Sequence, residues 1–394
     1  MSLSLKYQQL KSITRAGDWR FSFIPHIFGN LYLWILIFDI SFNKDSVLLL
    51  VMSLLTSFGF AALGYFINEY FDQEEDSKAG KINKLYYLNG KQKLLVLIPT
   101  LLLTFLPWAI IPFDNFSIAL IVLQVSLFII YSIPQIRIKR TPIASGIVDA
   151  AYAYIVPMLL SFHSFYLFSH AENYFFVFII LYSVLLFFVG FRNITIHQIN
   201  DIFKDKKVGI KSLPMILGVR NSDILLKSTL VIEAVLFFII AILLSIRFSS
   251  IFLTLFIAFS FISYVGYKEF KSLHKGIIVN RPFRHLTDSI YQIWFPIIAL
   301  FILIFQETYW LIILPIHLLL LVDLALIKFY FRKTMSSLVI LYYQILNIIW
   351  HKGLKAFISF VINNLIYLLF KIFGIDLKKK NISAIDFLKT KLGV

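Results

Sequence analysis

The sequence predicts an all-α integral membrane protein. Of its 394 residues, 59% are hydrophobic and only 15% are charged, whereas about 25% of the residues in typical soluble domains are charged. The mean hydropathy is +0.83. Apolar runs of about 17–25 residues, the length that crosses a bilayer as a helix, recur along the whole chain. Because the chain contains no cysteine, disulfides and thiolate metal sites are excluded.

Each of these apolar runs is expected to form a membrane-spanning helix. The expected spans lie near residues 21–41, 46–70, 93–112, 115–134, 142–162, 174–199, 227–246, 250–267, 285–306 and 308–328. The first nine belong to a predicted membrane domain, residues 1–306, and the last begins an extra C-terminal region, residues 307–394. Apolar stretches after Arg332 are interrupted and flanked by lysines. This pattern favours helices that lie along the membrane interface, with further spans as the alternative.

The basic residues predict how these helices are oriented. The net charge is +16, with 37 lysines and arginines. If the N-terminus is cytoplasmic, all of them except Lys44, Arg192 and Arg247 fall in segments on the cytoplasmic side. This bias is the positive-inside pattern of membrane proteins, so the charge orients helices and we expect no nucleic-acid partner. The abundance of Lys, Ile, Asn and Phe is typical of an AT-rich genome, and we predict a location in a bacterial inner membrane.

Most of the polar sequence lies on this same side. The largest polar insertions are residues 71–92, 135–141, 200–226 and 268–284, and each is cytoplasmic in the predicted topology. We therefore expect the functional loops at the cytoplasmic face.

A first acidic stripe follows the second span, in the segment FINEYFDQEEDSKAGKIN (residues 66–83). Asn68, Asp72 and Asp76 are spaced i, i+4 and i+8, so on a helix that continues out of the span they share one face. Carboxylates near a membrane interior are costly, which makes a functional role the default hypothesis.

A second stripe with the same spacing ends the sixth span, where Asn193, His197, Asp201 and Asp205 occur at intervals of four residues. Two stripes at the same side of two helices can face each other across a cavity. Carboxylate oxygens are ligands that Mg²⁺ prefers, and Mg²⁺ commonly bridges them to substrate phosphates. The sequence therefore predicts a metal-assisted diphosphate site at the cytoplasmic face.

Three segments resemble motifs of the UbiA superfamily of intramembrane prenyltransferases. The first stripe resembles the family pattern Asn-Asp-x-x-Asp-x-x-x-Asp. The second, followed by Gly209, Lys211, Ser212 and Leu213, resembles Asp-x-x-x-Asp with a subsequent Gly, Lys, Ser/Thr and Leu. The segment YSIPQIRIKR (residues 131–140) is similar to Tyr-Ser-x-Pro-Pro-x-Arg-x-Lys. The resemblance covers roughly residues 10–306.

The resemblance implies a barrel of about nine transmembrane helices around a cavity that opens to lipid. It implies that two Mg²⁺ ions bind an isoprenyl diphosphate through Asn68, Asp72, Asp76, Asp201 and Asp205, with these aspartates and His197 as the catalytic set. Candidates for binding substrate are Asn68, Lys81, Tyr131, Arg137, Lys139, Arg192, Asn193 and Lys211. The implied partners are an isoprenyl diphosphate, a lipophilic acceptor and membrane lipid.

Several positions depart from the family pattern. Glu69 replaces an aspartate beside Asn68, and Gln135 replaces the second proline of the third motif. Leu85 and Tyr87 stand where many members have proline and arginine. We therefore expect a differently shaped loop over the site.

Charged residues within the predicted spans raise further hypotheses. We expect Asp149 and Arg192 to form a structural ion pair, with acceptor recognition as the alternative. His197 is a candidate for orienting a ligand or deprotonating an acceptor, and a packing role is equally open. Glu233, in the seventh span, has no predicted partner.

Three functions are compatible with these observations. The first is transfer of an isoprenyl group from its diphosphate to an aromatic or quinone-precursor acceptor. The second is a terpene cyclase of the same superfamily, in which the substrate's own double bonds attack the cation. The third, a cation or lipid transporter, predicts polar residues in both leaflets and is disfavoured by their concentration on one side.

Overall fold

The structure is a computed structural model that describes residues 24–80, 83–172, 175–207, 209–248 and 290–321, with isolated positions between 250 and 260. Lys81, most of the predicted span at 250–267 and the tail beyond residue 321 therefore lie outside the described residues. Within the described ranges the regular structure is helical, without strands, which confirms the all-α prediction.

The helices follow the apolar runs. Their bounds are α3 Ile24–Ile37, α4 Lys44–Phe71, α5 Gln73–Ala79, α6 Gly90–Phe105, α7 Asn115–Ser132, α8 Pro142–Ala150, α9 Val156–Ser169, α10 Phe176–Lys207, α11 Leu213–Arg247, α14 Phe295–Gln306 and α15 Ile313–Leu321. Short 3₁₀ turns occupy η1 Leu106–Ala109, η2 Ile138–Arg140 and η5 Thr308–Ile312. Two π-helical turns, η3 Ala151–Ile155 and η4 Ile290–Trp294, lead directly into α9 and α14.

The described helices have the length and surface of a membrane protein. Six segments are long and apolar enough to cross a bilayer, and His26–Ile37, Ile290–Gln306 and Thr308–Leu318 are shorter apolar helices. Together they coincide with nine of the ten predicted spans. Large apolar side chains such as Leu95, Val122 and Phe238 lie exposed on the outer faces of these helices. Because lipid chains are as apolar as these side chains, this surface fits a hydrocarbon environment.

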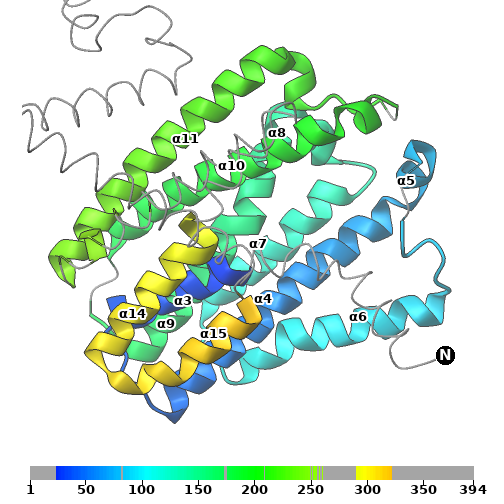
Figure 1. Ribbon diagram of the computed structural model, residues 1–394. Helices are drawn as coiled ribbons and strands as arrows, with labels where there is room; N and C mark the ends of the chain where they lie inside the picture. The colour runs from blue at the N-terminus through cyan, green and yellow to red at the C-terminus, as the bar shows by residue number, and fades with distance from the viewer. Residues whose placement is uncertain are drawn as a thin grey trace, which may run out of the picture.

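The helices pack around α3 (Figure 1). Residues Leu31–Leu36 of this helix are at most 1% exposed, and α3 contacts α4, α9 and α14. On either side of it, α10 lies alongside α11 and α4 lies alongside α6. The short helix α5 continues beyond α4 and contacts α10. This contact brings the two segments that carry the acidic stripes together.

The helix starts are capped by side chains. Asn43, Asn89 and Asp114 each accept a hydrogen bond from the backbone N–H three residues later, at 2.8–3.0 Å. In each case the side chain at that third position lies within hydrogen-bond distance of the capping residue's own N–H, which forms a capping box. These caps satisfy N–H groups that an α-helix leaves without a partner.

The polar insertion at residues 200–226 is largely helical, because α10 continues to Lys207 and α11 already begins at Leu213. The helical register expected for Asp201 and Asp205 is therefore present. Gly218 has a φ of 73° and divides α11 at a kink. A residue with a Cβ is disfavoured in this left-handed conformation, so glycine permits the change of direction here.

A close helix contact joins α4 to α6. A Cβ at Gly59 would lie 2.4 Å from the backbone N and Cα of Thr104. Beside it, the Thr56 hydroxyl donates to the Thr104 carbonyl at 2.6 Å, and Trp108 Nε1 donates to that hydroxyl at 2.9 Å. Small residues and interhelical hydrogen bonds of this kind drive helix association in membranes.

Gly59→Ala is expected to destabilise the protein by about 1–3 kcal/mol, because α4 and α6 must move apart to admit the methyl group. The measurement is reversible unfolding of the detergent-solubilised protein. Gly90→Ala is the matched control, since a Cβ at Gly90 meets nothing within 4 Å. Equal stability of the two variants would contradict this close packing.

Candidate active site

The helices enclose a cavity of about 800 Å³ that both acidic stripes line. Its polar residues include Asn68, Asp72, Asp76, Asn193, His197, Asp201 and Asp205. These are the residues of the two stripes, and the fold brings them to one cavity from two distant segments. The rest of the wall is largely apolar or aromatic. It includes Ile27, Phe60, Ala61, Tyr65, Phe128, Tyr131, Tyr152, Tyr154, Pro157 and Ile194.

The first stripe keeps its helical register where α4 gives way to α5. Asp72 separates the two helices, yet its backbone N–H donates to the Asn68 carbonyl at 3.0 Å and its own carbonyl accepts from Asp76 N–H at 2.8 Å. The predicted i, i+4, i+8 spacing therefore does place Asn68, Asp72 and Asp76 along one wall. Asn83 donates to the Asp76 carboxylate at 3.0 Å and to the Glu69 carbonyl at 2.8 Å, which ties Asn83 to both α4 and α5.

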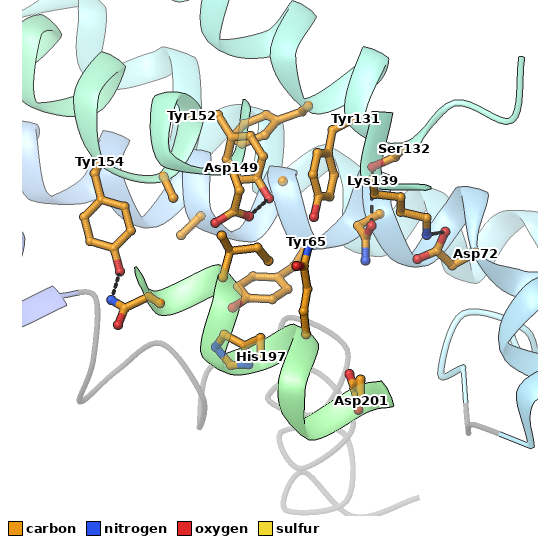
Figure 2. Close-up of a pocket in the computed structure, with 18 of the residues that line it drawn as sticks. Tyr65, Asp72, Tyr131, Ser132, Lys139, Asp149, Tyr152, Tyr154, His197 and Asp201 are labelled. Carbon is orange, nitrogen blue, oxygen red and sulfur yellow. Dashed lines mark hydrogen bonds and ion pairs between the residues drawn. The ribbon is translucent and has the colours of Figure 1, made fainter. Parts of the chain in front are cut away.

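The second stripe lies on the last turns of α10, opposite the first (Figure 2). Asp72 and Asp201 come from opposite walls in this view, with His197 one turn before Asp201. Gln198, which also lines the cavity, donates to the Ser145 hydroxyl of α8 at 2.9 Å. This hydrogen bond holds the stripe-bearing end of α10 against α8.

Basic side chains from the segment between α7 and α8 lie against the first stripe. Arg137 Nη2 contacts the Asp72 carboxylate at 3.1 Å, and Lys139 forms an ion pair with the same oxygen. Glu75 pairs with Arg137 and lies 3.6 Å from Arg140 and 3.8 Å from Lys139. All of these except Arg140 are largely buried, so the charges meet in a partly desolvated setting.

The backbone at Arg137 is adapted to this contact. Its φ of 45° and ψ of 58° are left-handed, a conformation that costs about 1–2 kcal/mol for a residue with a Cβ. Its backbone N–H donates to the Ile133 carbonyl at 2.8 Å. Strained residues of this kind persist where the surroundings hold them, and here the two carboxylates of Asp72 and Glu75 hold the guanidinium.

The donor set fits a metal ion shared with a phosphate ligand. Among the described residues, no three acidic or histidine side chains converge closely enough to hold an ion by themselves. Mg²⁺ rarely uses an all-protein cage and is usually bound by one or two carboxylates, waters and substrate phosphates. The Asn68 amide with the Asp72 and Asp76 carboxylates on one wall, and the Asp201 and Asp205 carboxylates on the facing wall, meet this requirement.

A further aspartate lies in the cavity away from both stripes. Asp149, near the end of α8, accepts a hydrogen bond from the Tyr152 hydroxyl. Tyr152 lies on the π-helical turn η3, and its carbonyl accepts from the Gln124 side chain at 2.8 Å. The Tyr152 ring also packs edge-on against Tyr131, with centroids 5.2 Å apart. The predicted residue Tyr131 thus belongs to the cavity wall.

The expected ion pair between Asp149 and Arg192 is wrong. Arg192 Nε instead donates to the Glu233 carboxylate of α11 at 2.7 Å, and both side chains are 1% exposed. Arg192 Nη1 also donates to the Asn193 side-chain carbonyl at 2.7 Å. Asn193 in turn donates to the Tyr154 hydroxyl at 2.6 Å. Arg192 is therefore bonded to the cavity residue Asn193 without lining the cavity itself, and Glu233 has the partner that the sequence did not reveal.

Two further residues singled out in the sequence, Lys211 and Leu85, are not among the described residues that line the cavity. Lys81 is outside the described residues. Lys211 is exposed, although its neighbours Ile210 and Ser212 line the cavity. Leu85, which departs from the family pattern, is fully buried in a small cluster with Phe66 and Val96.

Sequence reasoning missed several residues of the site. Glu75 lies off the stripe, and only the proximity of the basic segment reveals its role. Tyr152 and Tyr154 reach the cavity from a π-helical turn, and no pattern in the sequence indicates such a turn. Tyr65 lies three residues before Asn68 on α4, and helical spacing could have identified it as a neighbour of the stripe.

Comparison with known families identifies the class of protein. The model of the UbiA prenyltransferase family matches residues 23–276, well over half of the chain. The chain therefore belongs to the UbiA prenyltransferase family, which assigns it to the class of intramembrane prenyltransferases. No curated protein matches the sequence.

Solved structures of the same family share the fold. The apo structure of a UbiA homolog from Aeropyrum pernix K1 matches with a TM-score of 0.52 at 15% identity, covering 72% of this chain and 97% of that chain. A UbiA homolog from Archaeoglobus fulgidus bound to GPP and Mg²⁺ matches with a TM-score of 0.50 at 18% identity, covering 75% and 99%. These likenesses confirm the predicted helical membrane fold.

Removing either member of the Arg192–Glu233 pair is expected to destabilise the protein by about 3–5 kcal/mol, because the remaining charge is left buried without compensation. Arg192→Met and Glu233→Leu together are expected to be less destabilising than either change alone. Unfolding of the two single variants and the double variant measures the coupling. Strictly additive losses would show that the pair is not coupled.

Proposed function

We propose that the protein transfers an isoprenyl group from its diphosphate to a lipophilic acceptor within the membrane, with Mg²⁺ as cofactor. An aromatic ring or quinone precursor is the proposed class of acceptor. The observation that carries this proposal is that both acidic stripes face one cavity whose remaining wall is mainly apolar and aromatic. A ligand that fits both parts has a polyanionic head and a hydrocarbon tail.

The acidic residues are proposed to hold the metal at the head of this ligand. Asn68, Asp72 and Asp76 on one wall and Asp201 and Asp205 on the other supply oxygens of the type that Mg²⁺ prefers. When bound, Mg²⁺ would stabilise the charge of the departing diphosphate. The Archaeoglobus fulgidus homolog bound to GPP and Mg²⁺ supports this choice of ligand and ion.

The basic residues are proposed to bind diphosphate oxygens directly. Arg137 and Lys139 already lie beside Asp72, and a guanidinium and an ammonium both form strong, charge-assisted hydrogen bonds to phosphate. Lys81 and Lys211 remain candidates for the same role on the basis of their motifs. His197, which lines the cavity one turn from Asp201, remains a candidate for orienting a ligand.

The aromatic wall is suited to the intermediate that follows. When the allylic C–O bond breaks, its electron pair leaves with the diphosphate and an allylic cation remains in the cavity. The ring faces of Tyr65, Tyr131, Tyr152 and Tyr154 can attract this cation.

A membrane terpene cyclase is the alternative. It would bind the diphosphate between the same two acidic stripes and use the same aromatic wall. The substrate's own double bonds would take the place of an acceptor. We infer for either reaction that the stripes face the cytoplasm, because in the predicted topology they lie on the side of the membrane that carries all lysines and arginines except Lys44, Arg192 and Arg247.

The test is product formation by the purified protein from geranyl, farnesyl and geranylgeranyl diphosphates with Mg²⁺, with and without a lipid extract of the native membrane. A prenylated product that requires the extract supports the transferase. A cyclic hydrocarbon formed without it supports the cyclase.

Asp72→Ala and Asp201→Ala are each expected to reduce turnover by at least about 10²-fold, because the leaving diphosphate loses electrostatic stabilisation. Asp223→Ala on α11, outside the cavity, is the control; turnover that persists in both cavity variants would refute the metal site.

Glu75→Gln is expected to raise the Mg²⁺ concentration that gives half-maximal activity. Glu75 shares Arg137 and Lys139 with Asp72, so its neutralisation leaves Asp72 to attract both cations and strengthens their competition with the metal. We expect this concentration to increase roughly 3–10-fold, which corresponds to a loss of about 1 kcal/mol in the free energy of Mg²⁺ binding. The neighbouring, exposed Glu74→Gln is the matched control. An unchanged Mg²⁺ requirement in Glu75→Gln would contradict this role.

A further inference from the structure

Asp149 is a cavity carboxylate that the diphosphate site does not use. Five aspartates line the cavity, and Asp72, Asp76, Asp201 and Asp205 belong to the two stripes. Asp149 instead belongs to the last turn of α8 and is only partly buried. In Figure 2 it lies between the Asp72–Lys139 contact and Tyr154, among the aromatic rings of the wall.

The surroundings of Asp149 do not neutralise its charge. Its side chain accepts one hydrogen bond, from the Tyr152 hydroxyl to Oδ1. Within the described part of the chain, no lysine, arginine or histidine forms an ion pair with it. This contrasts with Arg192 and Glu233, which neutralise each other between α10 and α11. A carboxylate kept without a counter-ion inside a membrane protein is costly, so a purely structural role leaves it unexplained.

We propose that Asp149 is the catalytic base that accepts the proton released by the reaction, and that Tyr152 positions it. This inference rests on the proposed function. Tyr152 binds one carboxylate oxygen and leaves the other for the substrate. Tyr152 lies on the π-helical turn η3, which directly follows α8, the helix that carries Asp149.

The proton balance requires such a group in both proposed reactions. In the transfer, electrons of the acceptor form the new bond to the allylic carbon, and the acceptor then loses a proton from the attacked atom. In the cyclase, the final cation loses a proton from an adjacent carbon to form a double bond. In each case the allylic C–O bond has broken, its electron pair is on the diphosphate, and the proton moves to Oδ2 of Asp149.

The position of Asp149 suits this step better than the stripes do. The stripe carboxylates are proposed to hold the metal and the diphosphate, whereas the cation and its attacker lie deeper, among the rings. Tyr131 and Tyr152 pack together beside Asp149, so the carboxylate adjoins the part of the wall that would surround the cation.

The test compares the wild-type protein with Asp149→Asn, which preserves the shape of the side chain. The probes are geranylgeranyl diphosphate and Mg²⁺, with the native lipid extract for the transferase. Three quantities are measured: binding of the Mg²⁺ complex of the diphosphate, exchange of ¹⁸O between bridging and non-bridging positions of the diphosphate, and product formation. We expect binding and isotope exchange to stay within about 2-fold and product formation to fall by about 10²–10⁴-fold.

The outcomes separate this proposal from the proposed function. If the wild-type protein neither binds the diphosphate nor exchanges the isotope, the proposed function is wrong and this inference falls with it. If the wild-type protein does both and Asp149→Asn forms product at the wild-type rate, only the assignment of the base is wrong. A parallel loss of isotope exchange in Asp149→Asn would also overturn it, because that loss indicates stabilisation of the cation.

Chemical rescue distinguishes a base from a structural residue. Formate is expected to restore product formation at least 10-fold in Asp149→Ala, because the smaller side chain leaves room for a soluble carboxylate. Formate should have no such effect on Tyr152→Phe, which keeps the base and loses only its positioning hydrogen bond. Asp223→Asn, whose carboxylate pairs with Lys227 at 2.6 Å on α11, is the matched control. Absence of rescue in Asp149→Ala would count against the base.

Discussion

The structure depends on one constraint: a charged side chain among membrane helices needs an opposite charge or access to water. Between α10 and α11, Arg192 and Glu233 neutralise each other. At the cavity, Asp72 and Glu75 pair with Arg137 and Lys139, which joins α4 and α5 to the segment between α7 and α8. The first pair joins two consecutive helices, and the second group joins segments more than sixty residues apart at the edge of the cavity.

The fold was largely predictable because a bilayer restricts the choice of structure. With no water to satisfy backbone groups, an apolar run of sufficient length must form a helix, and nine predicted spans coincide with described helices. The sequence did not reveal how those helices associate. The contact of Gly59 with Thr104 and the kink at Gly218 depend on tertiary packing, which hydropathy does not encode.

The site was predictable where it follows helical spacing and unpredictable where it depends on packing. Both acidic stripes line the cavity because residues four apart share a helix face, and Asp72 preserves this register at the break between α4 and α5. The Asp149–Arg192 pair was wrong because Glu233, on the adjacent helix, lies nearer to the guanidinium. Glu75 escaped notice because its partners come from a loop more than sixty residues away.

The π-helical turn η3 also has a consequence for how such a protein can diversify. A π turn holds one residue more than an α turn, so a single insertion or deletion there would rotate the following helix, α9, relative to α8. The residues that face the cavity from this wall would change together, while the acidic stripes on α4, α5 and α10 would stay in place. The wall that η3 and α9 contribute to the hydrocarbon chamber can therefore evolve without rebuilding the acidic stripes.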